Sequence, residues 1–157
     1  MAKKKKTQIG FLVGLILAGV FVVAALMFAF TQYTYEPLLG STAYNGFTMA
    51  FGKDSYRGNM IFIVAFVLSL LAAFVAVLAA LRIIKVNSRF LFAICALFAL
   101  GAAVIYIVEF IYIKDMYTTK ILNQYENVKW AIPFWGAFAL NVVAFLGSGF
   151  GAVSAKK

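Results

Sequence analysis

The sequence contains no histidine and only one cysteine, and these shortages remove much of the chemistry that enzymes use. Without histidine there is no Ser–His or Cys–His pair, no usual zinc ligand and no histidine-ligated haem. Cys95 alone cannot form an intramolecular disulfide, and a single thiol cannot carry out dithiol exchange. We therefore expect a protein that is not an enzyme and that needs no cofactor.

Charged residues are also scarce: they make up 12% of the 157 residues, whereas 65% are hydrophobic. Soluble domains average about 25% charged and about 45–50% apolar residues. A water-soluble fold of this size cannot enclose so much apolar surface. The composition therefore predicts an integral membrane protein.

Four long apolar runs predict an all-α membrane protein, a four-helix bundle that forms a single domain over residues 1–157. The predicted segments are a first span at 9–30, an outer loop at 31–59, a second span at 60–81, an inner loop at 82–89, a third span at 90–113, an outer loop at 114–130 and a fourth span at 131–153. A run of 22 residues gives about 33 Å of helix, enough to cross a hydrocarbon core of roughly 30 Å. The first run exceeds the apolar region of a cleaved signal peptide, so we expect a retained anchor helix.

Basic residues are distributed unequally between the two predicted sides of the membrane. One side carries nine bases and no acid: Lys3, Lys4, Lys5, Lys6, Arg82, Lys85, Arg89, Lys156 and Lys157. The other side carries five bases, and all five acids lie in its loops or just inside the membrane. The positive-inside rule then predicts cytoplasmic termini in the plasma (cytoplasmic) membrane. This basic inner rim favours anionic lipids at the cytoplasmic face, and such a distribution does not indicate nucleic-acid binding.

Small residues at four-residue spacing predict where the helices pack, because helices in lipid associate through close contact of small side chains. The first span carries Gly10, Gly14 and Ala18, and the fourth carries Gly147 and Gly151. Both sets lie in the predicted cytoplasmic half, so we predict that these two spans cross closely there. The alternative is that the glycines only reflect how common glycine is in membrane helices.

Two polar side chains fall inside the predicted spans. Glu109 lies about one helical turn from the outer end of the third span, which makes it a candidate for ion or proton handling. The competing interpretation is an ion pair with Lys114, Lys129 or Arg57. Asn141 lies nearer mid-membrane, where we expect it to form a hydrogen bond to another helix.

The first outer loop contains an uncharged stretch, residues 37–52, whose composition is partly like that of a membrane-spanning segment. Its apolar and aromatic residues, which we predict to be contact residues, are Leu38, Leu39, Tyr44, Phe47, Met49 and Phe51. Period-two alternation in "QYTYE" and "FTMAF", separated by turn signals at Gly40 and Asn45-Gly46, predicts a small extracellular β-hairpin or sheet. The alternative is a re-entrant or interfacial segment. So apolar a loop must cover the bundle's top, the headgroup layer or another protein.

The second outer loop shows apolar residues at helical spacing: Ile121, Leu122, Tyr125 and Val128. This pattern predicts a short amphipathic helix that continues the third span. Four spans, cytoplasmic termini and a larger first outer loop with strands together resemble the layout of claudin-like tetraspan proteins. The tryptophan-rich signature and paired loop cysteines of claudins are absent from this sequence, so the resemblance implies a layout and no paracellular role.

Together these features favour a non-catalytic tetraspan protein that acts as a scaffold or assembly subunit through helix packing and an apolar outer loop. Its expected partners are the lipid bilayer and either itself or another membrane protein. The alternative is an oligomeric channel or small-solute transporter subunit, in which Asn141 or a ring of Glu109 residues lines a path between chains.

Overall fold

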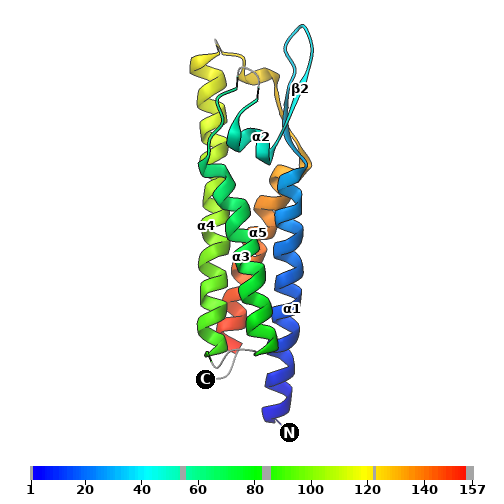
Figure 1. The fold of residues 1–157 in the computed structure, drawn as a ribbon, viewed down its shortest axis with the longest axis vertical. Helices are drawn as coiled ribbons and strands as arrows, with labels where there is room; N and C mark the ends of the chain where they lie inside the picture. Colours follow the sequence, from blue (N-terminus) through cyan, green and yellow to red (C-terminus); the bar gives the residue numbers. More distant parts are fainter. Residues whose placement is uncertain (1, 54–55, 83–85, 122, 155–157) are drawn as a thin grey trace.

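The computed structural model of the chain describes residues 2–53, 56–82, 86–121 and 123–154. Four long helices run side by side: α1 (Ala2–Ala29), α3 (Ile61–Leu81), α4 (Ser88–Asp115) and α5 (Ile132–Ser154) (Figure 1). Each contains a stretch that is long and apolar enough to cross a membrane. The prediction of four such helices is therefore confirmed.

Shorter elements gather at one end of the bundle, and we call this group the cap. They are the strands β1 (Thr31–Tyr35), β2 (Thr42–Asn45) and β3 (Val128–Trp130), the helix α2 (Gly46–Phe51), the π-helical turn η1 (Met116–Lys120) and the 3-10 turn η2 (Tyr125–Asn127). The first turns of α1 and the last turns of α5 lie at the end of the bundle away from the cap (Figure 1).

Buried residues recur at alternating spacings of three and four along the long helices. In α3 they include Phe62, Ala65, Ser69, Ala72, Ala76 and Ala79, and in α5 they are Phe134, Ala137, Asn141, Ala144, Ser148 and Gly151. A mean spacing of 3.5 residues is typical of left-handed helix packing, the commonest arrangement in membrane bundles. Most of these side chains are small, so the helices approach one another closely.

The opposite faces of the same helices are apolar and exposed. Only 28–39% of each apolar stretch is buried inside the protein, and large side chains such as Leu12, Phe74 and Leu97 point outward. A soluble monomer rarely exposes apolar patches of this extent. The exposed faces therefore indicate a protein embedded in a membrane, with lipid covering them.

One aromatic side chain from each long helix forms a layer where the bundle meets the cap. The ring centroid of Phe62 lies 4.9 Å from that of Phe28 and 5.1 Å from that of Tyr106. Phe134 completes the layer, with its centroid 5.2 Å from that of Tyr106. All four side chains are buried, so this aromatic layer separates the small-residue interior of the bundle from the cap.

The small residues of α1 pack against α3. A Cβ atom on Gly14 would lie only 2.7 Å from the Cβ of Ala80 and 3.0 Å from the carbonyl oxygen of Ala76. Ala18 is buried, whereas Gly10 has nothing within 4 Å of a Cβ position. The close approach that Gly14 permits is therefore between α1 and α3.

The two glycines of α5 face different helices, and Gly147 faces α1, with which the sequence predicted a close crossing. A Cβ on Gly147 would meet the side chain of Leu17 in α1 at 3.0 Å, and one on Gly151 would meet the ring of Phe92 in α4 at 3.0 Å. Although α1 and α5 are neighbours, large side chains fill the space beside these glycines. The spacing of the glycines predicted close contacts between helices, but Gly14 makes its contact with α3 and Gly151 with α4.

The sheet of the cap has the order β2-β1-β3, and both pairings are antiparallel. The predicted small sheet in the first outer loop is present, with Tyr33 of the central strand opposite Tyr44 on one side and Trp130 on the other. The third strand comes from the second outer loop. There the predicted continuation of the third span is present, because η1 extends α4 to Lys120. The amphipathic helix predicted from Ile121, Tyr125 and Val128 is wrong, because the chain forms η2 and β3 instead; Leu122 lies outside the described residues.

The stretch "FTMAF" forms helix α2, so the strand predicted there from its period-two pattern is wrong. The Oδ1 atom of Asn45 accepts a hydrogen bond from the backbone N–H of Thr48 at 2.9 Å, which is N-cap geometry. Gly46 starts the helix against α1, where a Cβ would lie 2.5 Å from the Phe28 ring. Capping and this close approach outweigh the alternation of Phe47, Met49 and Phe51.

The contact of Gly14 with α3 yields a test. We expect Gly14→Ala to lower the thermal unfolding temperature of the full chain in maltoside micelles, because forcing a methyl group into a packed interface costs about 1–3 kcal/mol. Gly10→Ala is the matched control, since it adds the same methyl group on the same helix where nothing lies nearby. Equal unfolding temperatures for the two variants would contradict the packing of α1 on α3.

Candidate functional site

A buried carboxyl group lies where the cap meets the bundle. Glu109 of α4 is 1% exposed, and both of its oxygens accept hydrogen bonds from the chain between α2 and α3. Its Oε2 accepts from the side-chain amide of Asn59 at 2.7 Å, and its Oε1 accepts from the hydroxyl of Tyr56 at 3.3 Å. The acid is therefore held by two uncharged donors.

The predicted ion pair of Glu109 with Lys114, Lys129 or Arg57 is wrong. Within the described part of the chain the one ion pair joins Lys129 to Glu36 at 2.5 Å, at the surface of the cap. Such an exposed pair contributes little to stability. The sequence places Glu109 near these bases along the chain, but the segment between α2 and α3 covers the carboxyl group with Tyr56 and Asn59 instead.

Backbone contacts fold that segment tightly over α4. Asn59 donates its backbone N–H to the Met49 carbonyl at 2.8 Å, and its Oδ1 accepts from the N–H of Ile61 at the start of α3 at 3.2 Å. A Cβ on Gly58 would lie 2.2 Å from the backbone nitrogen of Gly52, so only glycine permits this approach. These contacts aim the Asn59 amide at Glu109.

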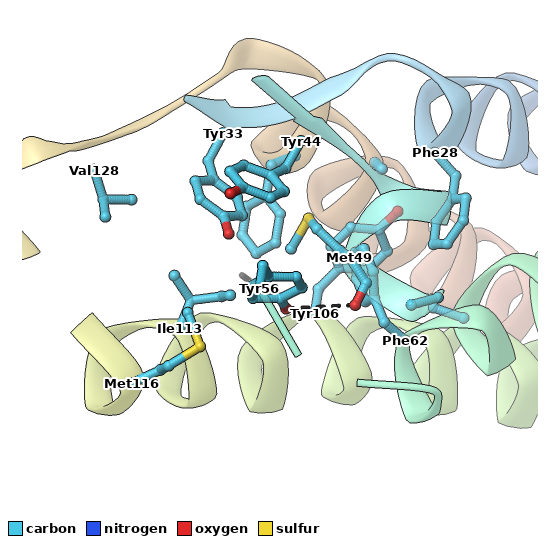
Figure 2. Close-up of a cluster of buried hydrophobic side chains, with 14 of the residues drawn as sticks. Phe28, Tyr33, Tyr44, Met49, Tyr56, Phe62, Tyr106, Ile113, Met116 and Val128 are labelled. Carbon is cyan, nitrogen blue, oxygen red and sulfur yellow. Dashed lines mark hydrogen bonds between the residues drawn. The ribbon is translucent and has the colours of Figure 1, made fainter. Parts of the chain in front are cut away.

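Tyrosines from four separate segments pack together above Glu109. Figure 2 shows the rings of Tyr33 and Tyr44 face to face, with Tyr56 beside them; the centroids are 4.8 Å apart for Tyr33–Tyr44 and 5.2 Å for Tyr44–Tyr56. The ring of Tyr117 lies 4.7 Å from that of Tyr35, and its hydroxyl lies 3.5 Å from the hydroxyl of Tyr33. We call these five residues the tyrosine cluster.

Burial keeps the phenols of Tyr33 and Tyr56 protonated, because it raises the pKa of each. It raises the pKa of Tyr33 far above the ordinary phenol value, and hydrogen bonding to Tyr117 adds to the effect. Burial likewise raises the pKa of Tyr56 far above that value, and the nearby Glu109 adds to it. Both hydroxyls therefore remain hydrogen-bond donors, as the bond from Tyr56 to Glu109 requires.

The tyrosine cluster encloses most of a cavity of about 240 Å³ in the cap. Its lining residues are Tyr35, Tyr44, Tyr56, Met116, Tyr117 and Ile121. Only Tyr35 and Ile121 are half-buried and the others are buried, so the opening lies beside these two. Tyr56 both lines the cavity and bonds to Glu109, which places the carboxyl group directly behind the cavity wall.

Asn141 forms the interhelical hydrogen bond that the sequence predicted. Its Oδ1 accepts from the hydroxyl of Ser69 in α3 at 3.2 Å, and its amide donates to the carbonyl of Ala137 at 2.9 Å. The hydrogen bonds of Asn141 and Glu109 involve different residues, so the structure does not join these two groups into one polar network. Among the described residues, no three acidic or cysteine side chains gather into a group that could hold a metal ion.

The six residues predicted as outer-loop contacts divide into two groups. Three are exposed: Leu38, Leu39 and Phe51. Three are buried or half-buried within the cap: Tyr44, Phe47 and Met49. The second group covers the bundle's own end, where the Phe47 ring packs on Phe28 at a centroid distance of 5.2 Å, so only the first group is available to another molecule.

The described members of the basic rim lie at the end of the bundle away from the cap. Arg82 follows the last turn of α3 and Arg89 lies in the first turn of α4. The backbone of residues Lys3, Lys4, Lys5 and Lys6 belongs to the first turns of α1, at the same end (Figure 1). Lys85, like Lys156 and Lys157, lies outside the described residues.

The bonding of Glu109 leads to a prediction about stability. We expect Glu109→Leu to lower the unfolding temperature, because it leaves the Asn59 amide without its acceptor, at about 1–3 kcal/mol, and leaves the Tyr56 hydroxyl only its 3.4 Å hydrogen bond to the Met49 carbonyl. Glu109→Gln keeps one acceptor oxygen and should cost less. Differential scanning fluorimetry of both variants in maltoside tests this order, with the exposed Glu126→Gln as control; unfolding of Glu109→Leu at the wild-type temperature would refute it.

Sequence reasoning missed the tyrosine cluster, although two signals were available. Tyrosine is frequent in both outer loops, and a buried phenol needs a polar partner, so such residues belong where a polar cap meets an apolar core.

Comparison of the chain with protein-family models, with curated proteins and with solved structures found no match.

Proposed function

We propose that this protein is a non-catalytic tetraspan membrane subunit that assembles with another membrane protein, or with a second copy of itself, through its outer loop. We further propose that its termini are cytoplasmic and that it resides in the plasma (cytoplasmic) membrane. The support for this orientation is the unequal distribution of charge. Six of the nine bases lie in described segments at the end of the bundle away from the cap, and the positive-inside rule assigns such segments to the cytoplasm: Lys3, Lys4, Lys5, Lys6, Arg82 and Arg89.

The observation that carries the assembly role is the exposure of two adjacent leucines. Leu38 and Leu39 are 104% and 98% exposed, so they make almost no contact with the rest of the chain. They lie in the loop between β1 and β2, which projects from the cap away from the bundle (Figure 1). Covering a leucine side chain is favourable by about 1.5–3 kcal/mol, so this leucine pair favours contact with an apolar surface.

The position of the leucine pair favours a protein partner over lipid. Strand β1 continues from α1 away from the bundle (Figure 1), and its five residues rise about 16 Å at 3.3 Å per residue. The pair follows this strand, so it lies beyond the layer of lipid tails that surrounds α1. A partner that projects to the same height would cover it.

The packing of the interior argues against a path through one chain. The four long helices bury small side chains against one another along their length, and the aromatic layer of Phe28, Phe62, Tyr106 and Phe134 closes the bundle beneath the cap. A channel would therefore have to form between chains. The alternative function as a channel therefore requires a ring-shaped assembly of several chains. Flux measurements on reconstituted protein would detect such a channel.

The proposal predicts that the leucine pair is needed for assembly and not for folding. In native membranes solubilised in mild detergent, the wild-type protein should elute as a complex, and Leu38→Ser combined with Leu39→Ser should elute at the mass of the free chain. Purified as free chains without the partner, both proteins should unfold at the same temperature, because the two side chains make almost no contact with their own chain.

The matched control replaces both leucines by methionine, which keeps the apolar surface and should keep the complex. Native mass spectrometry identifies the partner or the copy number in each case. A wild-type protein that elutes as a lone monomer, or a serine variant that retains the complex, would refute the assembly role of this loop.

A further inference from the structure

The cap cavity is lined by aromatic side chains, and no charged residue belongs to its lining. Four of its six lining residues are tyrosines, joined by Met116 and Ile121. The face of a tyrosine ring carries negative potential and attracts cations that lie within about 6 Å of its centroid. Several such rings around one space are the arrangement that proteins use to bind quaternary ammonium groups.

An acidic group without a cationic partner stands behind the same wall. Glu109 is buried, and among the described residues it accepts hydrogen bonds from Tyr56 and Asn59 and has no basic side chain within ion-pair distance. A buried carboxylate is stabilised by a nearby positive charge. Because Tyr56 links Glu109 to the cavity, a cation bound there would gain from the acid as well as from the rings.

The volume and position of the cavity limit the size and source of this cation. A cavity of about 150 Å³ is enough to bind benzene, so about 240 Å³ accommodates a trimethylammonium group but not a drug-sized molecule. The apolar stretch from Ser88 to Thr119 spans about 48 Å at 1.5 Å per residue, which exceeds the hydrocarbon core by roughly 18 Å. Met116 and Tyr117 therefore lie at or beyond headgroup depth.

We propose that the cap cavity binds a quaternary ammonium group, with the rings of Tyr35, Tyr44, Tyr56 and Tyr117 as its contacts and Glu109 as the nearby countercharge. The ligand is either free choline or the choline headgroup of a phospholipid, which share this chemistry. The proposal involves none of the residues that carry the assembly role, so either can fail without the other.

The decisive test compares choline with 3,3-dimethylbutan-1-ol, its uncharged isostere of the same shape. Each is titrated against the purified full-length protein in maltoside micelles by ligand-observed NMR, with empty micelles as the blank. We expect choline to bind about tenfold more tightly than the isostere, because only choline carries the charge that the rings attract. Equal binding of the two, or no binding of choline, would overturn the proposal.

Variants of Tyr117 and Glu109 then test whether choline binds in the cap cavity. Tyr117→Leu should weaken choline binding about tenfold, whereas Tyr117→Phe keeps a ring face and should bind within about twofold of wild type. Glu109→Gln should weaken the binding of choline and leave that of the isostere unchanged. Unaltered choline binding in both Tyr117→Leu and Glu109→Gln would place choline elsewhere and overturn the assignment; should Tyr117→Leu not fold, Glu109→Gln and the comparison of ligands still decide.

Nanodiscs of defined lipid distinguish the two sources of the ligand. In nanodiscs of phosphatidylglycerol, added choline should bind as it does in micelles. In nanodiscs of phosphatidylcholine, weaker apparent binding of choline would show that the lipid headgroup competes for the cavity, and equal binding would identify free choline as the ligand. Absence of choline binding in phosphatidylglycerol nanodiscs would contradict the site in a bilayer.

Discussion

The pairing of β1 with β3 is the interaction on which the cap depends. One residue separates α1 from β1, and one separates β3 from α5, so this pairing joins the cap ends of the first and last long helices. The backbone N–H of Ala131 extends it by donating to the carbonyl of Gln32 at 2.9 Å. Gln32 is fully buried, and its amide donates to the carbonyls of Met27 and Phe30 at 2.7 and 2.8 Å. The end of α1 thus finds hydrogen-bond partners without water, as a helix end near lipid must.

Two kinds of packing follow on the two sides of the aromatic layer. In the bundle, alanine, glycine and serine let the helices approach closely, and Asn141 to Ser69 is a polar contact between helices. In the cap, large tyrosines are packed at sites where their hydroxyls can bond to one another, to Glu109 or to backbone. Small side chains leave little space between helices, whereas rings fixed by strands and hydrogen bonds enclose a cavity. This difference in packing explains why the cavity and the hydrogen bonds of Glu109 are found at the cap and not between the small residues of the bundle.

The sequence was sufficient to predict what depends on composition and local period. The four apolar helices follow from the length of the runs, β1 follows from the alternation in "QYTYE", and the bond of Asn141 follows from its depth. The pairing of strands that are distant in the sequence could not be predicted. Tyr33 lies opposite Trp130, and the sequence near either residue gives no indication of its partner. Predicting the helix at Gly46–Phe51 would have required giving more weight to the helix-capping residue Asn45 than to the alternation of apolar residues that follows it. The position of Glu109 near the end of its helix suggested an ion pair with a nearby base. The segment between α2 and α3 instead places Tyr56 and Asn59 against the carboxyl group, and this fold could not be predicted from the sequence around Glu109.

The apolar character of the first outer loop has two separate physical causes, divided by their place relative to the sheet. Residues in and after β2, such as Tyr44 and Met49, are apolar because the sheet and α2 turn them inward over the aromatic layer. Leu38 and Leu39 fall between the strands, where the pairing of Tyr35 with Thr42 closes the hairpin and leaves residues 36–41 outside the sheet. Among the described residues, no element of the cap covers Leu38 or Leu39, so their apolar character does not come from packing against those residues. The stability of the cap therefore explains the first group, and the second group is the exposed surface on which the proposed assembly role rests.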